Sequence, residues 1–152
     1  MQESKYDLED RLLEFSTRIV RVAESMTPTR ASSHISDQLL RAGTSPYGHH
    51  GEAEGAESRA DFIHKMRVCH KELRESRRWL RLIGRVPLVA KPELLVDLLT
   101  ESDELVRIFA ASIRTAEANR SGNRSRSAQR LTLNAQIHGR PEPPVSELRL
   151  KR

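Results

Sequence analysis

The stretch that decides the fold is residues 62–83, FIHKMRVCHKELRESRRWLRLI. Its apolar and small residues recur alternately four and three residues apart, which places them along one face of an α-helix. Ser58 precedes the stretch as a candidate N-cap, and Gly84 with Pro87 follows it as a stop signal. The stretch therefore predicts one long amphipathic helix with a single buried face, made of Phe62, Met66, Cys69, Leu73, Ser76, Leu80 and Ile83.

Two further stretches show the same spacing. Residues 6–25 predict a helix that Thr27-Pro28 ends, and its apolar face is Leu8, Leu12, Phe15, Ile19, Val22 and Met26. The fourth helix begins at Pro92, a residue that helices favour in their first turn. Its buried face is predicted to contain Leu95, Leu98, Ser102, Leu105, Phe109, Ser112 and Ala116.

The second helix is less regular. It begins after Thr29 or Ser32 and is expected to run toward Ala56. Proline removes a backbone donor and crowds the carbonyl four residues earlier. We therefore expect Pro46 to kink or break this helix near residues 44–47. Four amphipathic helices with short connections favour an all-α, antiparallel up-down-up-down four-helix bundle.

Composition excludes several other classes of protein. The chain has 152 residues, of which 4% are aromatic, and one cysteine, so a disulfide framework or a cysteine-based zinc site is excluded. No apolar run approaches the roughly 20 residues that cross a membrane. Met1 is followed by acidic residues rather than by a signal peptide. We expect a cytoplasmic protein without membrane contact.

The charge of the chain changes sharply at Asn119. Residues 1–118 carry 18 basic and 19 acidic residues, whereas residues 119–152 carry eight basic and two acidic ones. The second segment is rich in Arg, Ser and Asn and later in Pro, which disfavours a packed core. We predict a bundle over residues 5–118 and a basic, mostly disordered tail over residues 119–152, with a weak helical stretch near residues 128–137.

A second row of residues runs along the predicted helix at 58–83, beside its apolar face. Residues 58–86 carry nine basic and three acidic residues. Like charges at helical spacing repel each other by about 0.2–0.5 kcal/mol per pair, so the row calls for a partner of opposite sign. Phosphate is one candidate. The alternative is ion pairing with carboxylates of other helices, such as Glu101 and Glu104. The row, which is the candidate nucleic-acid-binding site, is Arg67, Lys71, Arg74, Arg78, Arg81 and Arg85.

The combined spacing of several short segments resembles a known family. These segments are residues 38–45 (QLLRAGTS), Glu52-Ala53, Glu57-Ser58, residues 61–65 (DFIHK), Lys71-Glu72 and residues 79–82 (WLRL). They resemble the bacterial four-helix-bundle proteins that are encoded in intervening sequences of 23S rRNA genes. That group is similar to the accessory variability proteins of diversity-generating retroelements. His49 and Pro46 depart from the family's usual pattern.

The resemblance implies an antiparallel four-helix bundle that assembles as a homopentameric barrel and has no catalytic activity. In the retroelement relatives, a positively charged surface engages RNA and a reverse transcriptase. The biochemical role of the intervening-sequence members is essentially unassigned.

The residues themselves predict no catalytic site, metal site or cofactor. His49, His50 and Glu52 cluster in the sequence, but the chain has no Glu-x-x-His motif of the kind that di-iron bundles need. No Gly-rich phosphate loop or Ser-His-Asp order is present. Cys69 lies on the apolar face and is typical of a small buried hydrophobe.

Together these patterns predict a non-enzymatic, oligomeric bundle that binds RNA, or DNA, through basic surfaces. The alternative is a protein–protein adaptor or scaffold without direct nucleic-acid contact. Apolar residues outside the predicted buried faces suggest that a second face is also buried, as a homo-oligomer or a partner protein would require. They are Ile63, Leu82, Leu94, Leu99, Val106 and Ile113.

Overall fold

The computed structural model describes residues 6–138, and residues 1–5 and 139–152 lie outside this range. Its elements are four α-helices and one short 3-10 helix, and no strand occurs within residues 6–138. The all-α prediction is therefore confirmed. The elements are α1 (Tyr6–Ser25), α2 (Arg30–Glu54), α3 (Arg59–Arg85), η1 (Pro92–Leu94) and α4 (Leu95–His138).

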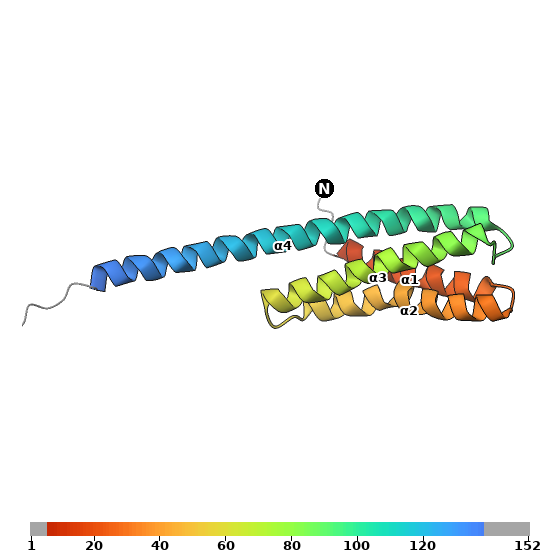
Figure 1. Ribbon diagram of the computed structural model, residues 1–152, viewed down its shortest axis with the longest axis horizontal. Coiled ribbons are helices and arrows are strands. Elements are labelled where there is room, and N and C mark those ends of the chain that lie inside the picture. Colours follow the sequence, from red (N-terminus) through yellow and green to blue (C-terminus); the bar gives the residue numbers. More distant parts are fainter. Residues whose placement is uncertain (1–5, 139–152) are drawn as a thin grey trace, which may run out of the picture. The chain divides into compact units, whose positions relative to one another are not determined.

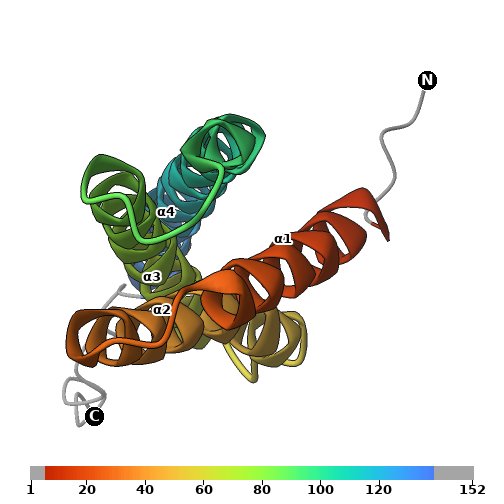
Figure 2. The same cartoon turned by 90° about the vertical axis from the view of Figure 1, so that its right-hand side faces the viewer.

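The four helices alternate in direction. The α1–α2 and α3–α4 connections lie at one end of the bundle, and the α2–α3 connection lies at the other (Figure 1). Figure 2 looks at the end that holds the α1–α2 and α3–α4 connections. Side chains from all four helices join one apolar core. The chain is thus an antiparallel four-helix bundle, as the sequence predicts.

The core follows the predicted faces closely, apart from differences in α3 and α4. Ile63 is buried there in place of Phe62, which packs against the core from a half-buried position. Ser112 and Ala116, expected on the buried face of α4, are only half-buried. The largest fully buried side chains are Leu12, Phe15, Ile19, Leu39, Leu73, Leu80, Ile83, Leu98, Leu105 and Phe109.

Local sequence signals set the beginnings of α2 and α3. Thr29 caps α2 by accepting a hydrogen bond from the backbone N–H of Ser32, whose hydroxyl accepts one from the backbone N–H of Thr29. Ser58 caps α3 in the same manner, accepting from the backbone N–H of Asp61 at 3.1 Å. These side chains satisfy donors that the first turn of a helix otherwise leaves without partners.

Of the kink or break predicted near residues 44–47 of α2, the break is wrong. The helix is continuous from Arg30 to Glu54 with Pro46 inside it. Pro46 is fully buried, and its carbonyl accepts a hydrogen bond from the Cys69 thiol of α3 at 3.6 Å. Tertiary packing of the ring against α3 therefore offsets the backbone hydrogen bond that proline cannot make, a cost that sequence reasoning alone assigned to a break.

Helices α1 and α2 approach each other closely at Gly43. A Cβ atom built on Gly43 would lie 2.6 Å from Cγ2 of Ile19, closer than side-chain carbons can pack. The Ser16 hydroxyl donates to the Gly43 carbonyl at 3.4 Å across the same contact. Only a residue without a side chain allows this approach, so Gly43 fixes the α1–α2 spacing.

The chain divides by its contacts into the units Met1–Glu117 and Ala118–Arg152. Residues 118–138 belong to α4, so more of the tail is helical than the predicted stretch at 128–137. Ala, Arg, Gln and Leu favour helices, and no proline occurs between positions 118 and 140. All side chains from 118 to 136 are exposed. The predicted disorder at residues 139–152 lies outside the described residues.

The apolar residues outside the predicted faces separate into three groups. Ile63 and Ile113 are buried in the core, Leu99 and Val106 are half-buried, and Leu82 and Leu94 are exposed. Exposed apolar side chains also include Val86 and Val96, near the α3–α4 connection. None of the helices within residues 6–138 is long and apolar enough to cross a membrane.

Candidate functional site

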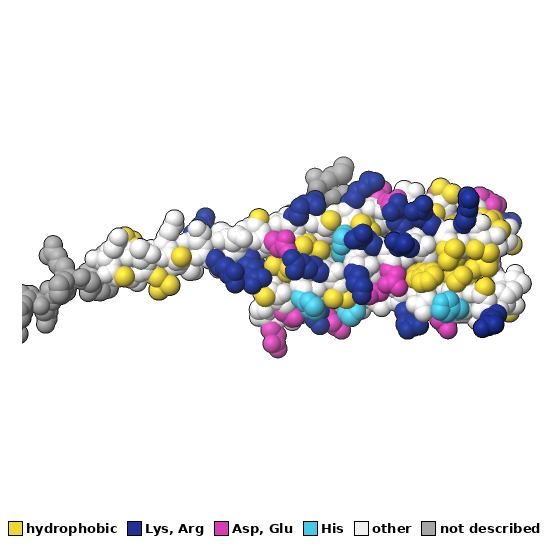
Figure 3. Space-filling view, in the orientation of Figure 1, with side chains coloured by type: hydrophobic (Ala, Val, Ile, Leu, Met, Phe, Trp, Pro, Cys, Tyr) yellow, Lys and Arg dark blue, Asp and Glu magenta, His cyan; other side chains and the backbone are white. Residues whose placement is uncertain are grey.

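The predicted row of cations lies on the outer surface of α3. Its buried face points into the bundle, which leaves the side chains at the intervening helical positions toward solvent. Figure 3 shows Lys and Arg side chains gathered over this side of the bundle, next to an apolar area. Every member of the predicted row is exposed: Arg67, Lys71, Arg74, Arg78, Arg81 and Arg85.

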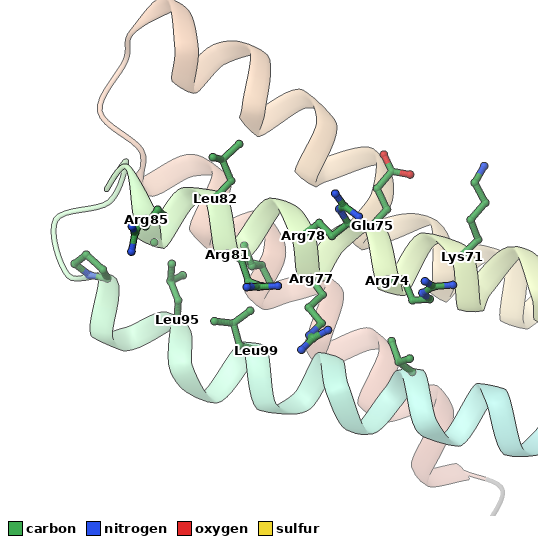
Figure 4. Close-up of a pocket in the computed structure, with 14 residues that line it drawn as sticks. Lys71, Arg74, Glu75, Arg77, Arg78, Arg81, Leu82, Arg85, Leu95 and Leu99 are labelled. Atoms are coloured by element: carbon green, nitrogen blue, oxygen red, sulfur yellow. The ribbon is translucent and has the colours of Figure 1, made fainter.

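Five of these residues line a groove between α3 and the beginning of α4. The groove has a volume of about 1130 Å³. Figure 4 shows Arg77, Arg81 and Arg85 on the side of α3 that faces α4, with Leu95 and Leu99 of α4 pointing toward them. We call this feature the α3–α4 groove. Its lining is Lys71, Arg74, Glu75, Arg77, Arg78, Leu80, Arg81, Leu82, Gly84, Arg85, Pro92, Leu95, Leu99 and Val106.

The lining is strongly cationic, with six basic side chains and one acidic side chain. The acidic one, Glu75, accepts a hydrogen bond from the indole N–H of Trp79 at 3.3 Å. Arg77 pairs with Asp103 of α4 at 2.6 Å, so this guanidinium is neutralised across the groove. The five other cations outnumber the single carboxylate that remains, Glu75, so the groove keeps an excess of positive charge.

The carboxylates that could have neutralised the row are engaged elsewhere. Arg11 of α1 donates two hydrogen bonds to Glu101, each at 2.9 Å, and a third to Glu104 at 2.7 Å. These bonds raise the pKa of the Arg11 guanidinium, chiefly through Glu101. Glu101 and Glu104 therefore hold α1 against α4 and do not reach α3, contrary to the alternative that assigned them to the row.

One member of the predicted row is paired. Arg67 forms an ion pair with Glu117 of α4 and does not line the groove. Within residues 6–138, the other five form no ion pair with a carboxylate. These five residues, which we call the free cation row, are Lys71, Arg74, Arg78, Arg81 and Arg85.

The pKa of His70, a residue beside the row, is affected by the row's positive charge. His70 is half-buried on α3. Burial lowers the pKa of His70 below its ordinary value of 6.5, and the positive charge of Arg74 lowers it further. Both effects disfavour the charged imidazolium form of His70.

Other candidate positions have structural explanations. His49 lies 3.4 Å from Glu52, which also pairs with Lys65 of α3 at 2.8 Å. His50 is buried and meets Phe109 edge-on, with ring centroids 6.1 Å apart. No group of three or more metal-ligating side chains occurs among the described residues.

The polar and nucleophilic residues on the buried faces are also accounted for. The hydroxyls of Ser76 and Ser102 donate to carbonyls of their own helices, Glu72 and Leu99, both at 2.7 Å. This geometry fits small residues at a helix contact rather than a polar network between helices. Burial raises the pKa of the Cys69 thiol to about 12, so the reactive thiolate is disfavoured.

Sequence reasoning found the row but missed the opposite wall of the groove. Helical spacing assigned five of the six basic lining residues and overlooked Arg77, which lies one position outside the row. Leu99 and Val106 were recognised as apolar residues outside the core face, and this was the available signal. Their position opposite the row depends on how α3 and α4 pack, which periodicity within one helix does not report.

The comparisons with known proteins agree with this architecture. Residues 5–111 match the family described as 23S rRNA-intervening sequence protein. Because the match covers more than half of the chain, the protein belongs to that family, as its segments between residues 38 and 82 suggested. No curated protein matches the chain.

A solved structure supports the same assignment. The chain is 34% identical to a protein from Bacteroides thetaiotaomicron that is described as being of unknown function and from the S23 ribosomal protein family. The match covers 70% of this chain and 97% of that protein, with a TM-score of 0.64.

Proposed function

We propose that this protein is a non-enzymatic, cytoplasmic bundle that binds RNA through the free cation row of α3. The observation that carries the proposal is the absence of carboxylate partners for these five residues among the described ones, although α4 beside them is rich in acids. Arginine binds phosphate through paired N–H donors, and displaced counterions add affinity. The family assignment, to proteins encoded within 23S rRNA genes, favours RNA as the polyanion.

The arginines of residues 118–138 support the proposal as a second cationic element. This segment carries Arg120, Arg124, Arg126 and Arg130 and has no acidic residue. An exposed helix of this composition attracts nucleic acid without reading its sequence. It has no aromatic side chain on which bases would stack.

Fluorescence anisotropy with a labelled RNA tests the proposal. We expect binding that weakens steeply between about 50 and 200 mM salt, because each phosphate contact releases counterions. If all five cations meet phosphates of a single strand, the slope of log affinity against log salt would be about −3.5. Absence of binding at low salt would refute the proposal.

A matched pair of variants separates the groove from net charge. Reversal of two row residues, Arg74→Glu with Arg78→Glu, should remove most of the affinity. Reversal of two exposed arginines outside the groove, Arg21→Glu with Arg30→Glu, changes the net charge equally and should cost much less. Equal losses in the two variants would mean that only net charge matters.

The alternative function is a scaffold that meets acidic protein surfaces through the same row. The exposed apolar side chains near the α3–α4 connection favour some protein contact as well. They also support the homo-oligomer that the family resemblance implies, with five subunits. Mass photometry should report a pentamer at micromolar concentration, and a monomer would contradict the assembly.

A further inference from the structure

The α3–α4 groove has two chemically different walls. The α3 wall carries Arg74, Arg81 and Arg85 of the free cation row, while Lys71 and Arg78 border the groove from the side of α3 that points away from α4; Leu95, Leu99 and Val106 of α4 form an apolar wall opposite. Figure 4 shows the α4 leucines directed toward the arginine side of α3. Leu99 and Val106 are half-buried, so part of their surface is open to a ligand. A phosphate surface alone would need only the first wall.

Duplex RNA and unpaired RNA would use these walls differently. A duplex presents phosphates and riboses on its outside and keeps its base faces stacked inside. It could satisfy the cations but would leave the apolar wall against water or charged backbone. An unpaired strand offers its phosphates and its base faces at once, and the base faces gain from burial against apolar and guanidinium surfaces.

We propose that the α3–α4 groove binds an unpaired RNA segment, with phosphates along the free cation row and bases against Leu99 and Val106. This inference rests on the proposed function and specifies its substrate. Charge complementarity selects a polyanion, and the apolar wall selects a polyanion with exposed base faces.

The dimensions of the groove agree with this occupant. Fourteen residues separate Lys71 from Arg85, so the row extends over about 21 Å at 1.5 Å per residue. The groove volume of about 1130 Å³ exceeds the range of about 300–1000 Å³ that is usual for one small ligand. It therefore has room for more than one base.

The apolar wall also predicts weak base selectivity. The side chains that α4 and Pro92 contribute to the lining have no hydrogen-bonding group, so this wall cannot read the edge of a base. Selection would act on whether bases are unpaired rather than on their identity.

Three RNA probes of the same length test the inference with the full chain. They are a mixed-sequence single strand, the same strand annealed to its complement, and the same strand with internal abasic positions. We expect the single strand to bind about tenfold more tightly than the abasic strand, because the abasic strand keeps its phosphates but loses base contacts. The single strand should also bind more tightly than the duplex.

The apolar wall is tested by Leu99→Ala, with Leu13→Ala as the matched control. Leu13 lies on α1, is exposed and does not line the groove. Leu99→Ala should weaken binding of the intact strand severalfold and leave the abasic strand and the salt slope unchanged. Leu13→Ala should leave the affinities for all three probes unchanged. Thermal unfolding of both variants identifies any effect of lost folding, and Val106→Ala provides a second variant if Leu99→Ala does not fold.

The outcomes distinguish the inference from the proposed function. Equal affinity for intact and abasic strands, or tighter binding of the duplex, would overturn the inference while RNA binding itself stands. Absence of binding to all three probes would refute both. Binding of an acidic amphipathic peptide in the groove without binding of any RNA probe would also refute both and favour the scaffold.

Discussion

The contacts of α1 and the contacts between α3 and α4 are built differently. Helix α1 packs closely on α2 at Gly43 and is held to α4 by the three hydrogen bonds of Arg11. Helices α3 and α4 are joined by the ion pairs Arg77–Asp103 and Arg67–Glu117, but an open groove with five unpaired cations lies between α3 and the beginning of α4. Glu101 and Glu104 of α4 are engaged by α1, and Asp103 and Glu117 are engaged by Arg77 and Arg67, so within residues 6–138 no ion pair joins α4 to the free cation row.

The glycines that face neighbouring helices show the same contrast. A Cβ on Gly43 would lie 2.6 Å from Ile19, whereas a Cβ on Gly84 of α3 would make an ordinary contact at 3.5 Å with Leu95. The α1–α2 contact therefore tolerates no added atom, and the α3–α4 side does. A tightly packed helix contact and an open groove thus occupy different parts of one bundle.

The largest expected effect comes from disrupting the close α1–α2 contact at Gly43. Gly43→Ala should lower the free energy of unfolding by about 2 kcal/mol, because Ile19 must move to admit the new methyl group. Gly48→Ala on the same helix is the control, since nothing lies within 4 Å of its Cβ position. That variant should gain up to about 1 kcal/mol from helix propensity. Urea unfolding measures both, and equal responses would contradict the close approach.

A smaller effect on stability is expected from removing one positive charge, either from the α1–α4 contact or from the free cation row. Arg11→Gln should lower the free energy of unfolding by about 1 kcal/mol, because it leaves Glu101 and Glu104 as neighbouring carboxylates without their common partner. Arg78→Gln should change it by less than about 0.5 kcal/mol, since an unpaired surface charge contributes little. The order should be reversed for RNA affinity: Arg78→Gln should weaken binding, and Arg11→Gln should leave it nearly unchanged. An Arg78→Gln protein as destabilised as Arg11→Gln would reveal a structural role for the row.

The smallest expected effect is a change in the pKa of His70, which lies beside the free cation row. His70 titrates below its ordinary value of 6.5, partly because of Arg74. Its contribution to stability is therefore present above that value and is lost as the pH falls through the lowered pKa. Arg74→Gln should raise the pKa of His70, and bound RNA should raise it further, because both reduce the local positive potential. Titration by NMR measures these shifts, and an unchanged pKa in Arg74→Gln would show that the row's charge is screened.

The sequence predicted correctly those features that depend on residues within a single helix. Most of the α3 core face, the cap at Ser58 and the row on α3 depend on residues within one helix, so the sequence predicted them, whereas it did not decide between Thr29 and Ser32 for the start of α2. The break at Pro46 was predicted wrongly because a local cost was offset by burial against α3. Arg67 was assigned to the site although Glu117 pairs with it, because the two residues lie 50 positions apart.

The sequence by itself determined that four amphipathic helices would form and that α3 would expose a row of positive charge. Apolar spacing and charge spacing are properties of a single helix, and a helix places residues by a fixed geometry. Only the tertiary structure decided which cations remain unpaired and what lies opposite them. Ion pairing and groove formation depend on distances between helices, and these follow from side-chain packing such as the contact of Gly43 with Ile19.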